Sequence, residues 1–151
     1  MLDNIVVKAM AIEHIDGVMV VENLSFKIPW SKNAFIEEVT NNKFAIYAVA
    51  LAGGKVIGYA GMWKVFDEGH ITNVAVHPEF RNNGVGRVLI EHLIDRARIE
   101  GIARMTLEVR RSNIAAQKLY QKYDFMESGV RKGYYADNGE DAIIMWKDNI
   151  G

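Results

Sequence analysis

Apolar and polar residues alternate in several short runs of the chain, which is the pattern of half-buried β-strands. The clearest run is Ala103–Arg110, in which three apolar residues share one face while Thr106, Glu108 and Arg110 lie on the other. Gly53-Gly54 separates two long apolar runs as a two-residue turn, so these runs predict a hairpin. The predicted strands begin at Val6 and cover 44–52, 55–66, 70–77, 103–110 and the two sides of a turn at 137–139.

Between these runs, apolar residues recur every three or four positions and predict four helices. Ile12, Ile15 and Val18 define the first, and Ser31 is placed to cap a second that runs to about Asn41. The others cover about 85–100, where Gly101 ends the helix, and about 113–122. This order predicts the α/β (α+β) class: one domain over 1–151, a mostly antiparallel mixed sheet of about seven strands, and helices on its faces.

The composition narrows the possible partners. Half of the 151 residues are hydrophobic, and 18 basic against 19 acidic residues leave a net charge of −1. This balance provides no broad charged surface for nucleic acid or an anionic membrane, and no apolar run is long enough to span a bilayer. The chain has no cysteine, which excludes disulfides and a cysteine nucleophile, and its four histidines lack metal-ligand spacing. We therefore expect a cytoplasmic protein with no metal and without nucleic-acid or membrane partners.

A glycine-rich loop stands directly before the third predicted helix. Its sequence is Arg81-Asn-Asn-Gly84-Val-Gly86, and N–H groups at a helix start, next to glycines that carry no Cβ, form a typical phosphate site. The loop lacks the third glycine of a dinucleotide fingerprint, since Leu89 stands there, and it lacks the Gly-Lys-Ser/Thr of a P-loop. From spacing alone, a tight strand-to-helix turn without a ligand explains the two glycines equally well.

The loop and the segments around it resemble the GNAT N-acetyltransferases. The resemblance rests on R-x-x-G-x-G after a strand that ends V-A-V-H-P, and it continues through Thr106–Tyr120. Ile28–Ser31 and Arg131–Met145 are similar to the RimI-type branch of the family. The resemblance implies that acetyl-CoA is the cosubstrate. It also implies that the acceptor is a protein N-terminus, with the N-terminal alanine of a ribosomal protein as the expected substrate.

The resemblance assigns two groups of residues, and also Asn113, to the cosubstrate. The main chain of Val74, Ala75 and Val76 would pair with the pantetheine arm, because the neighbouring strand is expected to splay away and leave an edge free. Loop N–H groups would hold the pyrophosphate, and Asn113 would hydrogen-bond the cosubstrate. The loop residues concerned are Asn82, Asn83, Gly84, Val85, Gly86 and Arg87. From the sequence pattern alone, without the family resemblance, Val74 and Val76 are expected to be ordinary core residues.

Glu108 and Tyr120 are the catalytic pair that the resemblance implies. Glu108 would be the general base, since an α-amino group with a pKa of about 7.7–8.0 is mostly protonated at pH 7. Tyr120 would be the general acid for the coenzyme A thiolate, and Val76 N–H would hold the oxyanion. Without the family, Glu108 is a surface glutamate and Tyr120 a core aromatic, although Leu119 and Ala115 fit the core of that helix better.

Three aromatic residues are candidates for binding the acceptor: Trp30, Tyr134 and Tyr135. Aromatic walls with polar tips suit a peptide end, and a core role for Trp30 and one tyrosine is the alternative. Two departures from the family pattern lie nearby in the sequence, Asp124 where a glycine is usual and Gly133 before the tyrosines. The second departure affects the prediction of the acceptor more than that of the cosubstrate.

Two rival functions stay open beside the main one. One is a GNAT enzyme that acts on a small amine, and the other is a domain that senses acyl-CoA without turnover. A sensor needs the glycine loop and Asn113 but not both Glu108 and Tyr120, so the presence of both favours an enzyme. We expect a monomer or a weak dimer.

Overall fold

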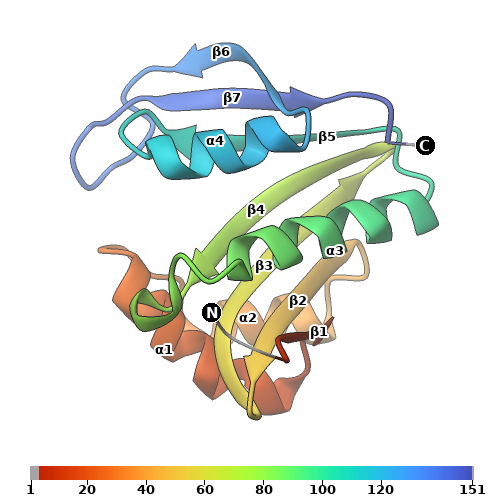
Figure 1. The fold of residues 1–151 in the computed structure, drawn as a ribbon, viewed down its shortest axis with the longest axis vertical. Helices are drawn as coiled ribbons and strands as arrows, with labels where there is room; N and C mark the ends of the chain where they lie inside the picture. The colour runs from red at the N-terminus through yellow and green to blue at the C-terminus, as the bar shows by residue number, and fades with distance from the viewer. Residues whose placement is uncertain (1–3, 151) are drawn as a thin grey trace.

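A single sheet organises the chain (Figure 1). The structure is a computed structural model that describes residues 4–150, and its seven strands follow the order β1-β2-β3-β4-β5-β7-β6. The strands are β1 Val6–Ala9, β2 Ala45–Ala52, β3 Lys55–Val65, β4 Glu68–Val76, β5 Arg104–Arg110, β6 Met126–Arg131 and β7 Ala142–Lys147. The α-helices are α1 Ile15–Ser25, α2 Lys32–Thr40, α3 Val85–Ile99 and α4 Ile114–Lys122, and 3₁₀ turns cover Ile12–His14 and Pro78–Phe80.

All neighbouring strands pair antiparallel except β4 and β5, so the predicted fold class is confirmed. The parallel pairing of β4 with β5 covers only Glu68–His70 against Arg104–Thr106. Beyond His70 the two strands diverge, and Figure 1 shows β4 running away from β5 toward α1. The register of β4 with β3 shifts between Ile71 and Asn73. This bulge bends β4 where the divergence begins, and the expected free edge results.

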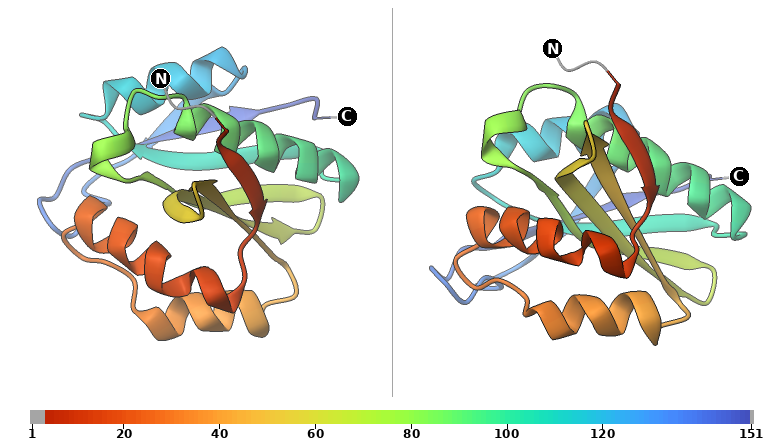
Figure 2. Two further views of the ribbon diagram at one scale, coloured as in Figure 1. Left: turned by 60° about the horizontal axis from the view of Figure 1, so that its bottom comes forward. Right: turned by 90° about the horizontal axis from the view of Figure 1, so that it is seen from below.

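Helices cover both faces of the sheet (Figure 2). The helix α3 packs on one face through the predicted residues Val85, Leu89, Leu93 and Ala97, which are all buried. On the other face, α1 and α2 form a second apolar cluster around Phe35. None of the helices in the described range 4–150 combines the length and the apolar character that a membrane span requires.

Local signals in the sequence explain the start of α2 and the turn between β2 and β3. The Ser31 side chain accepts the Ala34 N–H at 3.1 Å and caps α2, and Gly53 and Gly54 both have positive φ in the β2–β3 turn. One difference concerns the turn predicted at 137–139, which lies inside a longer connection from 132 to 141 between β6 and β7. The sequence pattern did not reveal this length because charged residues that pair with β5, not a short turn, shape the loop.

Candidate active site

A pocket of about 450 Å³ lies where β4 and β5 diverge. The diverging parts of β4 and β5 form two sides, and residues of the segment Phe26–Trp30 and of the β6–β7 loop close it. Seven of the predicted site residues line it together: Trp30, Val74, Glu108, Asn113, Tyr120, Tyr134 and Tyr135. Ala75, Val76 and the glycine loop at 82–87 lie outside this lining, farther along β4 and at the start of α3.

The edge of β4 that faces the pocket keeps main-chain groups free for a ligand. His77 N–H donates to the Ile57 carbonyl of β3 at 2.8 Å. Because successive main-chain groups of a strand point to alternate sides, those of Val76 and Val74 face away from β3, while those of Ala75 face it. The Val76 carbonyl accepts a bond from Arg81 Nε at 3.2 Å. The free edge therefore offers the groups of Val74 and the N–H of Val76.

The glycine loop leaves N–H groups without intrahelical acceptors at the start of α3. Gly84 is the N-cap of α3 with φ +80°, and Asn82 also has positive φ, at +64°. The first bond inside the helix runs from Val88 N–H to the Gly84 carbonyl at 3.1 Å. The N–H groups ahead of it lack intrahelical acceptors and carry the partial positive charge of the helix start.

Gly86 serves a different purpose from Gly84. A Cβ at Gly86 would lie 3.2 Å from Leu119 Cδ2, so this glycine allows α3 to approach α4. At Gly84 a Cβ would meet only the flexible Arg87 side chain, and the positive φ is the requirement. Arg87 itself stands 4.0 Å from Glu91 in an exposed ion pair. The loop is thus a tight turn in which Gly86 allows helix packing and Gly84 provides the left-handed N-cap.

Glu108 lies on β5 on the face opposite Leu107 and Val109, as the alternation predicted, and its side chain lines the pocket. It is about one quarter exposed, and its Oε1 accepts a bond from Arg131 Nε on β6 at 3.1 Å. The three apolar residues of the same strand are buried on the opposite face. The Arg131 side chain is exposed, and exposed ion pairs are weak. The Glu108 carboxylate can therefore exchange Arg131 for an incoming amine.

Tyr120 combines a core position with a place in the pocket lining. It is 7% exposed and its ring packs against Phe125 with centroids 5.9 Å apart. Burial raises the pKa of Tyr120 well above its ordinary value, so the phenol stays protonated. The expectation that Ala115 belongs to the core is wrong, because it is exposed, and Leu119 is only partly buried. The helix α4 thus places Tyr120 where the core and the pocket lining meet.

Asn113 is the N-cap of α4 and its Oδ1 accepts the Ala116 N–H at 3.1 Å. The side chain is exposed and reaches the pocket lining. Its capping bond uses only the carbonyl oxygen, which leaves the amide group as a donor. Asn113 can therefore both fix the helix start and hydrogen-bond a ligand.

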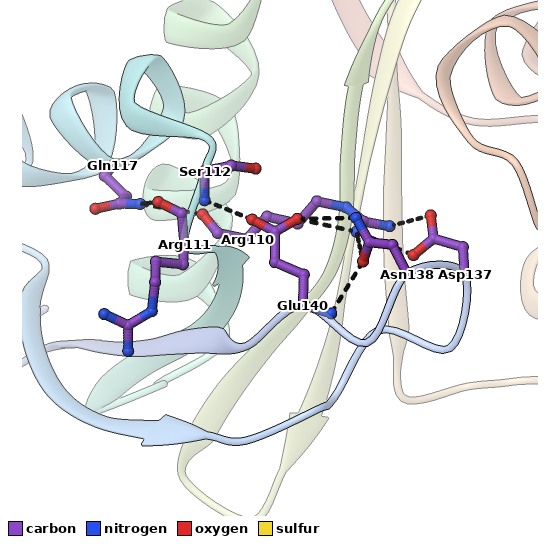
Figure 3. A network of polar contacts seen from close by, with 7 residues as sticks. All are labelled: Arg110, Arg111, Ser112, Gln117, Asp137, Asn138 and Glu140. Carbon is purple, nitrogen blue, oxygen red and sulfur yellow. Dashed lines mark hydrogen bonds and ion pairs between the residues drawn. The ribbon is translucent and has the colours of Figure 1, made fainter.

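The β6–β7 loop is held over the pocket by Arg110 of β5 (Figure 3). The guanidinium donates to Asp137 Oδ2 at 2.8 Å and to Glu140 Oε1 at 3.3 Å, and it stacks 4.0 Å above the Tyr135 ring. Burial is the main cause that raises the pKa of Tyr135, to about 12. Tyr134 meets Tyr135 edge to face at 5.1 Å and is half exposed.

Trp30 lines the pocket from the segment Phe26–Trp30, whereas the two tyrosines line it from the β6–β7 loop. Trp30 is partly buried and packs against Phe35 of α2 with ring centroids 5.4 Å apart. Its main chain is fixed by Glu22, whose Oε2 accepts the Trp30 N–H at 2.8 Å. The aromatic candidates thus face the pocket from two separate loops, one on each side.

Comparison with known proteins identifies the family. The family model described as the acetyltransferase (GNAT) family matches residues 15–125. The chain belongs to the GNAT acetyltransferase family. The resemblance seen in the glycine loop and in the segments that follow it is therefore confirmed.

Individual GNAT relatives are similar over most of the chain. A Bacillus subtilis (strain 168) protein, provisionally named [ribosomal protein bS18]-alanine N-acetyltransferase, is 43% identical over 93% of each chain. The Escherichia coli (strain K12) [ribosomal protein bS18]-alanine N-acetyltransferase is 38% identical over 83% of this chain and 84% of its own. A crystal structure of the ribosomal-protein-S18-alanine N-acetyltransferase from Escherichia coli superimposes with a TM-score of 0.88 over 97% of this chain and 94% of that chain, at 32% identity.

Sequence reasoning missed two residues of the GNAT pocket. Glu22 is 1% exposed and Arg110 organises the β6–β7 loop, yet neither was singled out as a site residue. The signal for Glu22 was present, since a charged residue follows the apolar run Val18–Val21 on the buried side of a helix. Among residues 4–150, no group of three or more potential ligands is placed to hold a metal ion.

Proposed function

We propose that this GNAT acetyltransferase transfers the acetyl group of acetyl-CoA to the N-terminal α-amino group of a protein. The substrate is the N-terminal alanine of ribosomal protein bS18, the acceptor for which two similar relatives are named. The observation that carries the proposal is the pocket between β4 and β5, where Glu108 and Tyr120 lie beside a free strand edge and below aromatic walls.

The cosubstrate fits the β4 side of the site. The pantetheine arm carries amides that suit the free N–H and carbonyl of Val74, in the manner of an added strand, and the N–H of Val76 remains for the acetyl carbonyl. The pyrophosphate suits the N–H groups from Asn82 to Arg87, because the Gly84 backbone leaves the start of α3 accessible. Asn113 lines the same pocket at the start of α4, with its amide group free to donate.

The transfer proceeds directly between the two substrates. Glu108, directly or through water, takes a proton from the acceptor ammonium, and the neutral nitrogen attacks the thioester carbonyl. The carbonyl oxygen gains negative charge and accepts a bond from the Val76 N–H. As the C–N bond forms and the C–S bond breaks, Tyr120 donates its proton to the departing thiolate. The nitrogen then loses its second proton, which returns through solvent to the Tyr120 phenolate. The products are the N-acetylated protein and coenzyme A.

The acceptor enters from the side opposite to the cosubstrate. Trp30, Tyr134 and Tyr135 provide aromatic surface with polar tips for the first residues of a peptide. The lining does not enclose the pocket, so a chain can extend from it into solvent. We place the protein in the cytoplasm, where ribosomal proteins are made, as a single domain that acts as a monomer or a weak dimer.

A coenzyme A release assay tests the function. The acceptors are a peptide with the alanine-starting N-terminus of bS18, the same peptide with a blocked N-terminus, a lysine-containing blocked peptide, and polyamines. We expect release only with the free N-terminus. Turnover of polyamines but not of the peptide would replace the proposal with a small-amine acetyltransferase. Binding of acetyl-CoA without turnover of any acceptor would favour a sensor.

A further inference from the structure

Glu22 is a buried carboxyl group at the wall of the pocket that the proposed reaction does not use. It lies near the end of α1, is 1% exposed and contributes to the pocket lining. Its Oε2 accepts the Trp30 N–H at 2.8 Å, and its Oε1 accepts the Tyr59 hydroxyl. Since both oxygens act as acceptors from neutral donors, the group has the bonding pattern of an ionised carboxylate.

Three other charged residues of the pocket lining take part in ion pairs. Glu108 pairs with Arg131 at 3.1 Å, and Arg110 pairs with Asp137 at 2.8 Å. Lys27 also attracts Asp137 and lowers the pKa of that carboxyl, although less than Arg110 does. Within residues 4–150, no ion pair within 4.0 Å joins Glu22 to a basic side chain. Glu22 is therefore a buried carboxyl group of the pocket lining without an ion pair among the described residues.

A buried carboxylate with only neutral donors is unfavourable unless a cation comes near. The neighbouring phenols respond to its charge: burial is the first cause that raises the pKa of Tyr59, and the negative charge of Glu22 is the second. An acceptor α-amino group is mostly protonated at pH 7, because its ordinary pKa is about 7.7–8.0. A ligand of that kind supplies the missing positive charge.

We propose that Glu22 is a positioning residue that selects the acceptor in its ammonium form through its charge, while its hydrogen bonds with the Trp30 N–H and the Tyr59 hydroxyl hold the carboxylate in place. Glu108 then removes the proton from an amine already drawn into the pocket. The inference rests on the proposed function, since it assumes that an amine enters this pocket.

The experiment compares binding of two peptides to the full-length protein in the presence of coenzyme A, which cannot transfer an acetyl group. One peptide begins with alanine and the other is its desamino analogue, in which hydrogen replaces the α-amino group. We expect Glu22→Gln to weaken binding of the amine peptide about tenfold or more and to change binding of the desamino peptide less than about threefold, because only the first carries the charge. Acetyl-CoA affinity, measured separately, reports that the variant is folded.

Two further variants keep the inference testable if Glu22→Gln does not fold. Tyr59→Phe removes one bond to Glu22 but keeps its charge, so the preference for the amine peptide should persist. Glu127→Gln should also retain that preference, since it removes only an exposed carboxylate of β6 outside the pocket lining. Loss of the preference in either variant, or an equal loss for both peptides in Glu22→Gln, would overturn the role of Glu22.

The wild-type release assay separates this result from the proposed function. If the wild type turns over small amines but not peptides, the proposed acceptor is wrong, and the same comparison is made with such an amine and its uncharged analogue. If the wild type acetylates peptides while Glu22→Gln shows no selective loss, only the inference about Glu22 fails. If no amine binds at all, both fail.

Discussion

The two walls of the pocket present different chemistry to their ligands. The β4 wall, with the glycine loop at its end, offers main-chain groups: the free edge at Val74 and Val76 and the start of α3. The opposite wall offers side chains, carried by β5, α4 and the β6–β7 loop. The difference teaches that substitutions on the first wall matter only where they change the backbone, whereas on the second wall each side chain counts separately.

The largest effect is expected on the side-chain wall. Glu108→Gln removes the proposed base while keeping shape, so kcat should fall by about 10² or more with acetyl-CoA affinity unchanged. Steady-state kinetics and a separate titration of acetyl-CoA measure the two quantities. Glu127→Gln is the matched control, because Glu127 is an exposed glutamate of β6 outside the pocket lining. Unchanged turnover in Glu108→Gln would remove this residue from the mechanism.

On the main-chain wall, Gly84→Val should have the next largest effect. A β-branched residue strains the φ of +80°, so the N-cap must shift and acetyl-CoA affinity should fall by about tenfold or more. Gly53→Val is the control, since Gly53 has φ +56° in the β2–β3 turn and open space around it. Similar losses of stability but unequal losses of affinity would support the anion site. Equal affinity of Gly84→Val and Gly53→Val for acetyl-CoA would mean that the loop is only a turn.

This contrast also explains what the sequence could predict. The glycine loop and the alternation around Glu108 are local patterns. The loop indeed precedes the helix α3, and Glu108 indeed lies on the face opposite the buried apolar residues of β5. The burial of Tyr120 was not evident from the sequence, because it depends on how α4 packs over β5 and the core. The role of Arg110 was equally hidden, since its partners Asp137 and Glu140 lie in a distant loop.

Tyr120→Phe should have an intermediate effect. Loss of the proposed acid should lower kcat by about tenfold or more, while the ring keeps its packing against Phe125. The control is Tyr123→Phe at the end of the same helix, whose hydroxyl donates to Glu91 at 2.8 Å outside the pocket lining. Rates measured with limiting and saturating peptide distinguish a loss of kcat from a change in KM. Equal kinetics of the two variants would exclude Tyr120 as the acid.

The β6–β7 loop should show a weaker, pH-dependent effect. Hydrogen bonds from Ser112 are the main cause that lowers the pKa of Glu140 to about 2, and Arg110 adds to them. Because the folded pKa lies below the unfolded one, the contribution of Glu140 is complete above about pH 5 and is lost as the pH falls toward 2. Urea unfolding at several pH values should show a shallower acid dependence in Glu140→Gln. The same acid dependence in both proteins would mean that this carboxyl does not stabilise the fold.

The smallest effect is expected from Val74→Ala, although Val74 lies at the centre of the proposed cosubstrate edge. The side chain packs beside the core, so its truncation should lower the free energy of unfolding by roughly 1 kcal/mol. The main chain is unchanged, and acetyl-CoA affinity should change less than about threefold. Val74→Pro is the informative partner, because proline removes the N–H that faces the free edge. If Val74→Ala weakens acetyl-CoA as much as Val74→Pro does, the valine side chain binds the cosubstrate and the division between a main-chain wall and a side-chain wall is wrong.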